Sequence, residues 1–166
     1  MKNIVLIGMP GCGKSVIGKI LAEKLEIIFL DIDTYIEAST ELTITEIFKN
    51  SDACFRDLEA KVAVEVSDKV PAVISTGGGM VKRYENILNL KKNGIIIYIN
   101  RPIENIEADI DVEIRPILSK DPSQLYILFK ERGALYKKYC DYEVMNISNI
   151  DDVVNNIIEI YTQNNN

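Results

Sequence analysis

The sequence predicts an α/β domain built on a mostly parallel sheet of five strands. Short apolar runs alternate along the chain with amphipathic stretches, an order typical of strands joined by covering helices. A glycine-rich motif stands between the first apolar run and the first amphipathic stretch, where a phosphate-binding loop can work. With 166 residues, of which 47% are hydrophobic, the chain is long enough for one domain with its own core and too short for two. We therefore expect residues 1–166 to form a single domain.

Five apolar runs are the expected strands, and four stretches between them read as helices. The strands are Asn3–Ile7, Ile27–Leu30, Ala72–Ser75, Ile95–Ile99 and Tyr142–Ile147. The helices are Lys14–Leu25, Met80–Lys92, Ser123–Tyr139 and Asp151–Tyr161. The stretch Arg56–Lys69 fits either type, and we favour a helix because it holds no glycine or proline and strands are usually shorter. Between Arg101 and Ser119 the pattern weakens among many charges, which predicts a mobile surface segment.

Composition limits the kind of chemistry and the kind of partner. The chain has no histidine, so any reaction must rest on carboxylates, cations and backbone amides. A net charge of −6 argues against general nucleic-acid binding. The three cysteines are scattered without a CxxC spacing, which favours a reducing compartment over a disulfide framework. No apolar stretch is long enough for a membrane span. We expect a soluble cytoplasmic monomer that acts on small molecules.

The segment Gly8–Ser15 matches the phosphate-loop pattern GxxxxGK[ST]. Its glycines let the loop curl so that backbone N–H groups point at phosphate oxygens, and the following helix N-terminus adds partial positive charge. Lys14 would reach the β- and γ-phosphates of ATP, and the hydroxyl of Ser15 would bind Mg²⁺. The alternative, an ordinary glycine turn, is disfavoured by the flanking strand and helix. The residues expected to bind the nucleotide here are Gly11, Cys12, Gly13, Lys14, Ser15 and Val16.

Two acids and a run of glycines follow the next predicted strands. Asp31 and Asp33 stand where the second strand ends, and the carboxyl ends of neighbouring parallel strands face one crevice. On an extended segment both would point to the same side. One could then hold hydrated Mg²⁺ while the other accepts a proton from an attacking hydroxyl; a plain turn and cap role is the alternative. After the third strand, Gly77, Gly78 and Gly79 would offer bare backbone to a ligand, unless they form only a flexible loop.

Arginine placement matters more than net charge for an anionic substrate. The chain has only five: Arg56, Arg83, Arg101, Arg115 and Arg132. A lone arginine is usually a solvated surface charge. The residues alone therefore do not separate the functional arginines from the others.

The order and spacing of several motifs resemble the shikimate kinase family over nearly the whole chain. The residues that carry the resemblance are the phosphate loop, Leu30–Asp33, Phe55-Arg56, Ser75–Gly79, Arg115–Leu118 and Arg132–Tyr136. Other small phosphate-loop kinases share the first motif but not the FR, GGG and RxxLY set together. The resemblance implies a three-layer α/β/α fold of the nucleoside-monophosphate-kinase type with a five-stranded parallel sheet. It also implies a substrate-binding region at about residues 31–60 and a lid at about residues 107–119.

What the resemblance implies about function is specific. ATP would donate its γ-phosphoryl group to the 3-hydroxyl of shikimate, giving shikimate 3-phosphate and ADP on the route to chorismate and the aromatic amino acids. Asp33 and Lys14 would be catalytic, together with Arg115 on the lid, which would also meet the nucleotide phosphates. Ser15 and Asp31 would serve the Mg²⁺ shell. The substrate-binding residues would be Asp33, Arg56, Gly77, Gly78, Gly79 and Arg132, with the two arginines on the carboxylate.

The chain departs from the family pattern at the lid, where Glu107-Ala108-Asp109 replace an arginine that many members carry, and Asp111 and Glu113 add further acidity. Either nucleotide binding is weaker here, or the adenine is held by apolar contacts and the loop near Ser148. Two other functions stay open on the sequence. One is a phosphate-loop kinase for another small acceptor, such as gluconate or a nucleoside monophosphate. The other is a nucleotide-binding module that has lost catalysis.

Overall fold

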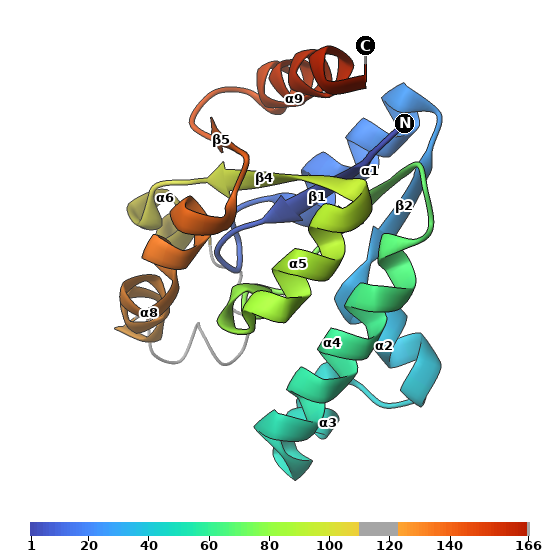
Figure 1. The fold of residues 1–166 in the computed structure, drawn as a ribbon. Helices are drawn as coiled ribbons and strands as arrows, with labels where there is room; N and C mark the ends of the chain where they lie inside the picture. The colour runs from blue at the N-terminus through green and yellow to red at the C-terminus, as the bar shows by residue number, and fades with distance from the viewer. Residues whose placement is uncertain (110–122, 166) are drawn as a thin grey trace.

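The computed structural model describes residues 1–109 and 123–165, and these form one five-stranded sheet with helices on both faces (Figure 1). The strand order is β2-β3-β1-β4-β5, and every neighbouring pair is parallel. The strands are β1 (Asn3–Ile7), β2 (Ile28–Asp31), β3 (Ala72–Ser75), β4 (Gly94–Asn100) and β5 (Tyr142–Met145). The predicted fold class is confirmed, and the predicted strand ends differ from these by at most two residues.

The helices complete a three-layer arrangement. Helices α1 and α9 cover one face of the sheet, while α4, α5 and α8 cover the other (Figure 1). Their bounds are α1 (Lys14–Leu25), α2 (Ile32–Thr40), α3 (Ile44–Asn50), α4 (Asp52–Ser67), α5 (Tyr84–Asn93), α6 (Ile103–Ala108), α8 (Ser123–Tyr139) and α9 (Ile150–Asn165), with a short 3₁₀ helix η1 (Met80–Lys82). Within the described ranges, no helix has the length and apolar character needed to cross a membrane.

The centre of the sheet is apolar on both of its sides. Every residue of β1 and β3 is buried, as are Ile95–Ile99 in β4. This explains why these strands read as continuous apolar runs without alternation, because helices cover both faces of a parallel sheet. The core thereby fixes the positions of the strand ends from which the loops of the site emerge.

Two helices that the sequence pattern did not predict follow β2. Asp31 begins α2 as its N-cap, since its Oδ1 accepts hydrogen bonds from the backbone N–H groups of Asp33 (3.1 Å) and Thr34 (3.3 Å). A capping box between Thr43 and Glu46 begins α3. Asp33 therefore lies in the first turn of a helix. The expectation that Asp31 and Asp33 share an extended segment is wrong, and the cap role is confirmed for Asp31.

Two further helices differ from the prediction. The expected helix at residues 80–92 is divided at Arg83, whose backbone is extended, into η1 and α5. The segment from Arg101 was expected to be irregular, but its first part forms α6, which is anchored by the buried side chains of Ile103 and Ile106. For the ambiguous stretch at 56–69, the helical interpretation is confirmed by α4. The predicted lid beyond Asp109 lies outside the described residues up to position 122.

The sheet order brings the strand ends of the site together. Strand β1 lies between β3 and β4, and the chain leaves β1 to form β2 on one side while β4 lies on the other. Such a reversal of direction opens a crevice at the carboxyl ends of the strands. In register, Ser75 pairs with both Leu6 of β1 and Asp31 of β2. The phosphate loop, the acids after β2 and the glycines after β3 therefore meet at one edge.

Candidate active site

The phosphate loop joins β1 to α1 and depends on glycine at its first position. Gly8 has φ 148°, and a Cβ there would lie 2.7 Å from the backbone oxygen of Ile99. Gly13, the residue before α1, has φ 104°. Both conformations are strained for residues with a side chain. The chain thus turns sharply and leaves the N-terminus of α1 facing the pocket, as an anion-binding loop requires.

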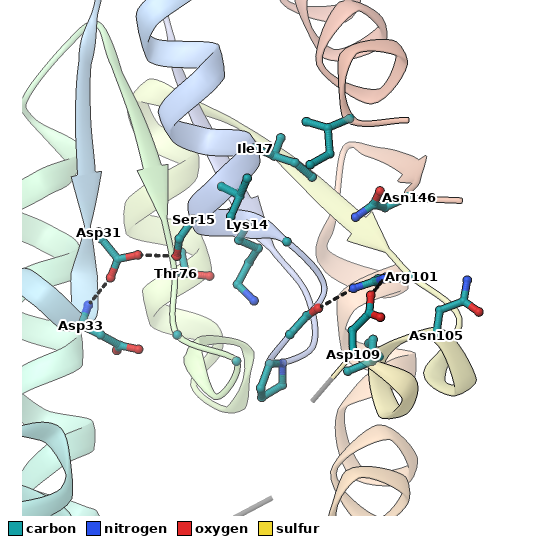
Figure 2. Close-up of a pocket in the computed structure, with 18 of the residues that line it drawn as sticks. Lys14, Ser15, Ile17, Asp31, Asp33, Thr76, Arg101, Asn105, Asp109 and Asn146 are labelled. Carbon is teal, nitrogen blue, oxygen red and sulfur yellow. Dashed lines mark hydrogen bonds and ion pairs between the residues drawn. The ribbon is translucent and has the colours of Figure 1, made fainter. Parts of the chain in front are cut away.

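Lys14 lies inside the curve of this loop. Its side chain is buried, and Nζ donates hydrogen bonds to the carbonyl oxygens of Gly8 (2.8 Å) and Met9 (2.9 Å). Nζ also approaches the Cys12 sulfur at 3.6 Å. Figure 2 shows the Lys14 side chain between the acidic residues after β2 and the phosphate loop. The ammonium group is therefore placed between the two halves of the pocket.

Ser15 forms the link between the phosphate loop and β2. Its hydroxyl donates to Asp31 Oδ2 at 2.8 Å (Figure 2), and its Oγ lies 3.3 Å from the Ser75 hydroxyl. Oxygen ligands of this kind suit Mg²⁺, which usually takes one or two protein ligands and completes its shell with water and phosphate oxygens. The described residues contain no cluster of three or more acidic, histidine or cysteine ligands. Ser15 and Asp31 thus fit a magnesium site of the nucleotide-bound type, and do not fit a protein-enclosed metal centre.

Asp33 is the acidic residue of the pocket whose pKa is shifted most. Burial, together with the nearby charge of Asp31, raises its pKa from 3.8 to about 6, although Lys14 acts in the opposite direction. Its Oδ1 is buried and has no hydrogen-bond partner among the described residues. A carboxylate with a pKa near neutrality and a free oxygen is suited to accept a proton.

Arg56 and Glu59 form a buried ion pair one turn apart on α4. Arg56 Nη1 donates to Glu59 Oε2 at 2.7 Å, and the Glu59 side chain is fully buried. The guanidinium also lies 5.0 Å from the ring centre of Phe55 and 5.6 Å from that of Phe48. Burial raises the pKa of Glu59, while Arg56 acts in the opposite direction. The pair holds a planar cation at a fixed place beside the glycine loop.

The glycine loop after β3 touches these groups directly. A Cβ on Gly79 would lie 2.6 Å from the guanidinium carbon of Arg56, and one on Gly77 would lie 3.0 Å from Asp33 Oδ1. A Cβ on Gly78 would lie 2.8 Å from the ring of Pro10 in the phosphate loop. The absence of side chains at these three positions thus lets the loop reach the phosphate loop, Asp33 and Arg56 together.

Helix α8 places Tyr136 against the same loop and carries Arg132 one turn earlier. The Tyr136 hydroxyl donates to the Gly78 carbonyl at 2.6 Å, and the Tyr136 ring stacks on Tyr98 of β4 with centres 5.3 Å apart. Arg132 is buried, and its charge lowers the pKa of Glu59. Arg132 Nε has no hydrogen-bond partner among the described residues. The charges of two buried guanidinium groups, Arg56 on α4 and Arg132 on α8, therefore both favour the ionised form of Glu59.

Most of the predicted nucleotide and metal residues line one pocket of about 900 Å³. Those that line it are Gly11, Gly13, Lys14, Ser15, Val16, Asp31, Asp33, Gly77 and Gly78. Gly79, Arg56 and Arg132 are not among its lining residues. Gly79 and Arg56 join the site through the contacts above, and Arg132 is linked to it by the effect of its charge on Glu59. Cys12, a residue of the loop, is fully buried and does not line the pocket. Arg115 lies outside the described residues.

Sequence reasoning missed three side chains of this site. Glu59 could have been found as an acid three residues after Arg56 on a helix, the spacing of an ion pair. Tyr136 belonged to the RxxLY motif but received no role. Arg101, which the sequence could not separate from Arg83, lines the pocket, whereas Arg83 pairs with Asp57 at the surface. Only the fold shows which arginine follows a strand next to β1.

Comparison with known proteins agrees with the geometry. The sequence model of the family described as shikimate kinase matches residues 10–162. The chain belongs to the shikimate kinase family. A shikimate kinase of Clostridium botulinum (strain Eklund 17B / Type B) is 48% identical over 165 residues, covering 99% of this chain and 100% of the relative. One of Clostridium beijerinckii is 44% identical, covering 99% and 98%.

Solved structures of shikimate kinases have the same fold as this chain. The shikimate kinase of Acinetobacter baumannii, in complex with shikimate, has a TM-score of 0.91 and 33% identity, covering 99% of this chain and 94% of that one. The enzyme of Aquifex aeolicus has a TM-score of 0.84 and 34% identity, covering 98% and 97%. A gluconokinase of Sinorhizobium meliloti reaches a TM-score of only 0.53 at 13% identity, which shows a shared fold and nothing of its substrate.

Proposed function

We propose that the chain is an ATP-dependent kinase that transfers the γ-phosphoryl group to the 3-hydroxyl of shikimate, giving shikimate 3-phosphate and ADP for the synthesis of chorismate and the aromatic amino acids. Family membership supports the reaction class and the acceptor. The observation that carries the proposal is the position of Asp33, whose charge interacts with both Lys14 and Arg56. One carboxylate thereby interacts with both the phosphate-binding cation and the cation expected to hold the acceptor.

On the nucleotide side, the backbone of the phosphate loop and Lys14 bind the phosphates of ATP. Ser15 and Asp31 are the ligands we assign to Mg²⁺, which when bound neutralises charge on the phosphate oxygens. Arg115, on the lid, is assigned to the phosphates during transfer. The supporting observations are the loop geometry and the Ser15–Asp31 hydrogen bond.

On the acceptor side, Arg56 and Arg132 bind the carboxylate of shikimate, and the backbone of Gly77–Gly79 contacts its ring hydroxyls. A planar guanidinium offers a carboxylate two parallel hydrogen bonds, which a lysine cannot. Asp33 Oδ1 orients the attacking hydroxyl and accepts its proton. Phosphoryl transfer demands positioning and charge stabilisation above all, so a site without histidine suffices.

The setting that we propose is a cytoplasmic monomer of one domain. The net charge of −6 agrees with a small-molecule enzyme rather than a nucleic-acid-binding protein. All three cysteines of the structure are free, as in proteins of a reducing compartment. Gel filtration with light scattering would test the monomer.

A coupled assay of ADP release tests the function. The purified chain is supplied with MgATP and, in turn, shikimate, gluconate and a set of nucleoside monophosphates. We expect turnover that depends on shikimate. Turnover with another acceptor alone would replace shikimate in the proposal, and binding of ATP without turnover on any acceptor would make the chain a nucleotide-binding module.

A further inference from the structure

Tyr136 ends the RxxLY segment of α8, and the proposed reaction gives it no part. Its side chain is fully buried. The ring stacks on that of Tyr98, a buried residue of β4, with ring centres 5.3 Å apart. Strand β4 pairs with β1 at the centre of the sheet, so the Tyr136 ring is held against the core of the fold.

The Tyr136 hydroxyl is bonded to the backbone of the glycine loop. It donates to the Gly78 carbonyl oxygen at 2.6 Å, from a residue 58 positions away in the chain. Burial raises the pKa of this hydroxyl above its ordinary value of 10.0, although the charge of Arg132 acts in the opposite direction. The hydroxyl therefore stays protonated at neutral pH and remains a donor. A ring fixed by stacking thus gives the Gly78 carbonyl a fixed direction.

A fixed carbonyl also fixes the amide group that follows it. The peptide bond between Gly78 and Gly79 is trans. In a planar trans peptide the C=O of one residue and the N–H of the next point in opposite directions. The Gly79 N–H therefore points away from the Tyr136 hydroxyl.

The Gly79 N–H has the character of a binding group. Gly79 is buried, and its N–H has no hydrogen-bond partner among residues 1–109 and 123–165. Buried backbone donors are nearly always paired, because an unpaired one costs free energy. Gly79 also lies directly against Arg56, since a Cβ there would come within 2.6 Å of the guanidinium carbon. An unpaired donor beside a cation is suited to an oxygen atom of a ligand.

We propose that Tyr136 is a positioning residue for the acceptor: by holding the Gly78 carbonyl, it directs the Gly79 N–H, beside Arg56, toward an oxygen of shikimate. This inference rests on the proposed function and adds to it the side chain that orients a backbone donor. Tyr136 acts through the peptide and does not touch the acceptor. Arg132 and Tyr136 are four residues apart on one helix, so α8 supplies both a cation and the group that orients the loop.

Tyr136→Phe removes the hydroxyl and keeps the stacked ring. We expect the KM for shikimate to rise about three- to tenfold, the size of one lost hydrogen bond. The value of kcat and the KM for ATP should change by less than about twofold, because the loss falls on acceptor binding alone. Titration calorimetry with a non-hydrolysable ATP analogue and Mg²⁺ would check that the nucleotide still binds as it does to the wild type.

Tyr161→Phe is the matched control. Tyr161 is also buried, and its hydroxyl also donates to a backbone carbonyl, that of Lys2, at 3.0 Å. Lys2 precedes the first residue of β1, whereas the phosphate loop follows the last, so this bond lies at the opposite edge of the sheet. Urea denaturation should show a similar loss of stability in the two variants. Only Tyr136→Phe should have a raised KM for shikimate.

The amide of Gly79 can also be observed directly, since the chain has only nine glycines. In NMR spectra of protein labelled with the heavy nitrogen isotope at glycine, the signal that Gly79→Ala removes is that of Gly79. Adding shikimate should move the Gly79 proton signal downfield in the wild type, as a new hydrogen bond does, and by less in Tyr136→Phe. The wild-type measurement decides the inference even if Tyr136→Phe fails to fold.

Three outcomes would overturn the inference. The first is a KM for shikimate in Tyr136→Phe that equals that of Tyr161→Phe, which would make the role of Tyr136 purely structural. The second is an equal rise in the KM for shikimate and for ATP. The third is a Gly79 signal that responds to the ATP analogue and not to shikimate, in a wild type that phosphorylates shikimate. A wild type without turnover on shikimate is a different result, because it would contradict the proposed function itself.

Discussion

The carboxylates of Asp33 and Glu59 face the same point of the glycine loop. A methyl group on the Cα of Gly77 would lie 3.0 Å from Asp33 Oδ1 and 3.0 Å from Glu59 Oε1. Both oxygens are buried without a hydrogen-bond partner among the described residues. Burial raises the pKa of both acids, and the charge of Asp33 raises the pKa of Glu59 further. A buried oxygen atom without a hydrogen bond costs free energy unless a donor reaches it. These two oxygens are therefore suited to accept hydrogen bonds from the hydroxyl groups of a polyol ligand.

Replacing Asp33 by asparagine should remove most of the turnover and leave nucleotide binding nearly intact. The amide cannot accept the proton of the attacking hydroxyl, and a loss of about 10²- to 10⁴-fold in kcat is the usual size of such an effect. Steady-state kinetics with calorimetry of the ATP analogue would measure both quantities. Loss of nucleotide binding would instead place Asp33 in the phosphate or metal site.

Because the pKa of Asp33 is raised, we expect activity to fall at low pH. The carboxylate must be ionised to accept a proton, so kcat/KM for the acceptor should fall as the pH drops below about 6, approaching a tenfold loss per pH unit. A pH–rate profile over pH 5–8 would show it. A profile that stays flat to pH 5 would mean that Asp33 only orients the hydroxyl.

The same group links stability to pH. Because the pKa of Asp33 is higher in the folded state (about 6) than its ordinary value of 3.8, the folded state favours the protonated acid. The stability gained from protonated Asp33 is fully present at pH values below the unfolded-state pKa, and it is lost as the pH rises through about 6. Asp33→Asn, which carries no charge, should therefore be more stable than the wild type by on the order of 2 kcal/mol at pH 7.5, and by much less at pH 4.5. Urea denaturation at both pH values checks this.

Much of the fold followed from the sequence because the core is so regular. The fully buried strands β1, β3 and β4 appear as unbroken apolar runs, and α1 carries a clear apolar face, so their positions could be predicted within a residue. The helices α2 and α3 could not, since both are short and depend on side-chain caps at Asp31 and Thr43 rather than on apolar periodicity. A DxD after a strand reads equally well as extended chain.

The site was predictable only in part, for a similar reason. The phosphate loop and the glycine run are continuous motifs, and the backbone geometry they need leaves few alternatives. Side-chain contacts between distant segments leave no such mark in the sequence, so Arg101, which donates to the Gly11 carbonyl across 90 positions, could not be distinguished from Arg83. Arg56 and Arg132 were chosen through family resemblance. In the structure Arg56 forms an ion pair with Glu59, and the charge of Arg132 lowers the Glu59 pKa.

Loss of the Glu59 charge should weaken both the fold and the acceptor site. Glu59→Gln keeps the shape but leaves the buried Arg56 guanidinium without its counter-charge, and breaking such a pair costs about 3–5 kcal/mol. The acceptor KM should rise as well, because Arg56 loses its orientation. Asp57→Asn is the matched control: it breaks the exposed pair with Arg83 and should cost below about 1 kcal/mol. Equal costs in urea denaturation would mean that Glu59 is protonated in the fold.

Lysine in place of either buried arginine should affect the acceptor and spare the nucleotide. Arg56→Lys and Arg132→Lys retain a positive charge but lose the paired hydrogen bonds to a carboxylate, so we expect the KM for shikimate to rise about tenfold or more. The KM for ATP should change little. Arg83→Lys serves as the surface control. An unchanged KM for shikimate would remove that arginine from the acceptor site.

A methyl group on Gly79 should disturb the acceptor site without unfolding the protein. The added Cβ would lie 2.6 Å from the guanidinium carbon of Arg56, and a flexible side chain can move away where backbone cannot. Gly79→Ala should therefore raise the KM for shikimate at nearly normal stability. Gly8→Ala is the contrasting variant, since its Cβ would meet the Ile99 backbone oxygen at 2.7 Å from a residue with φ 148°, and it should unfold or lose nucleotide binding. Thermal denaturation and steady-state kinetics on the two variants would distinguish the effects. A Gly79→Ala variant with normal KM would show that Arg56 can move without cost, and that it does not hold the acceptor in the position proposed.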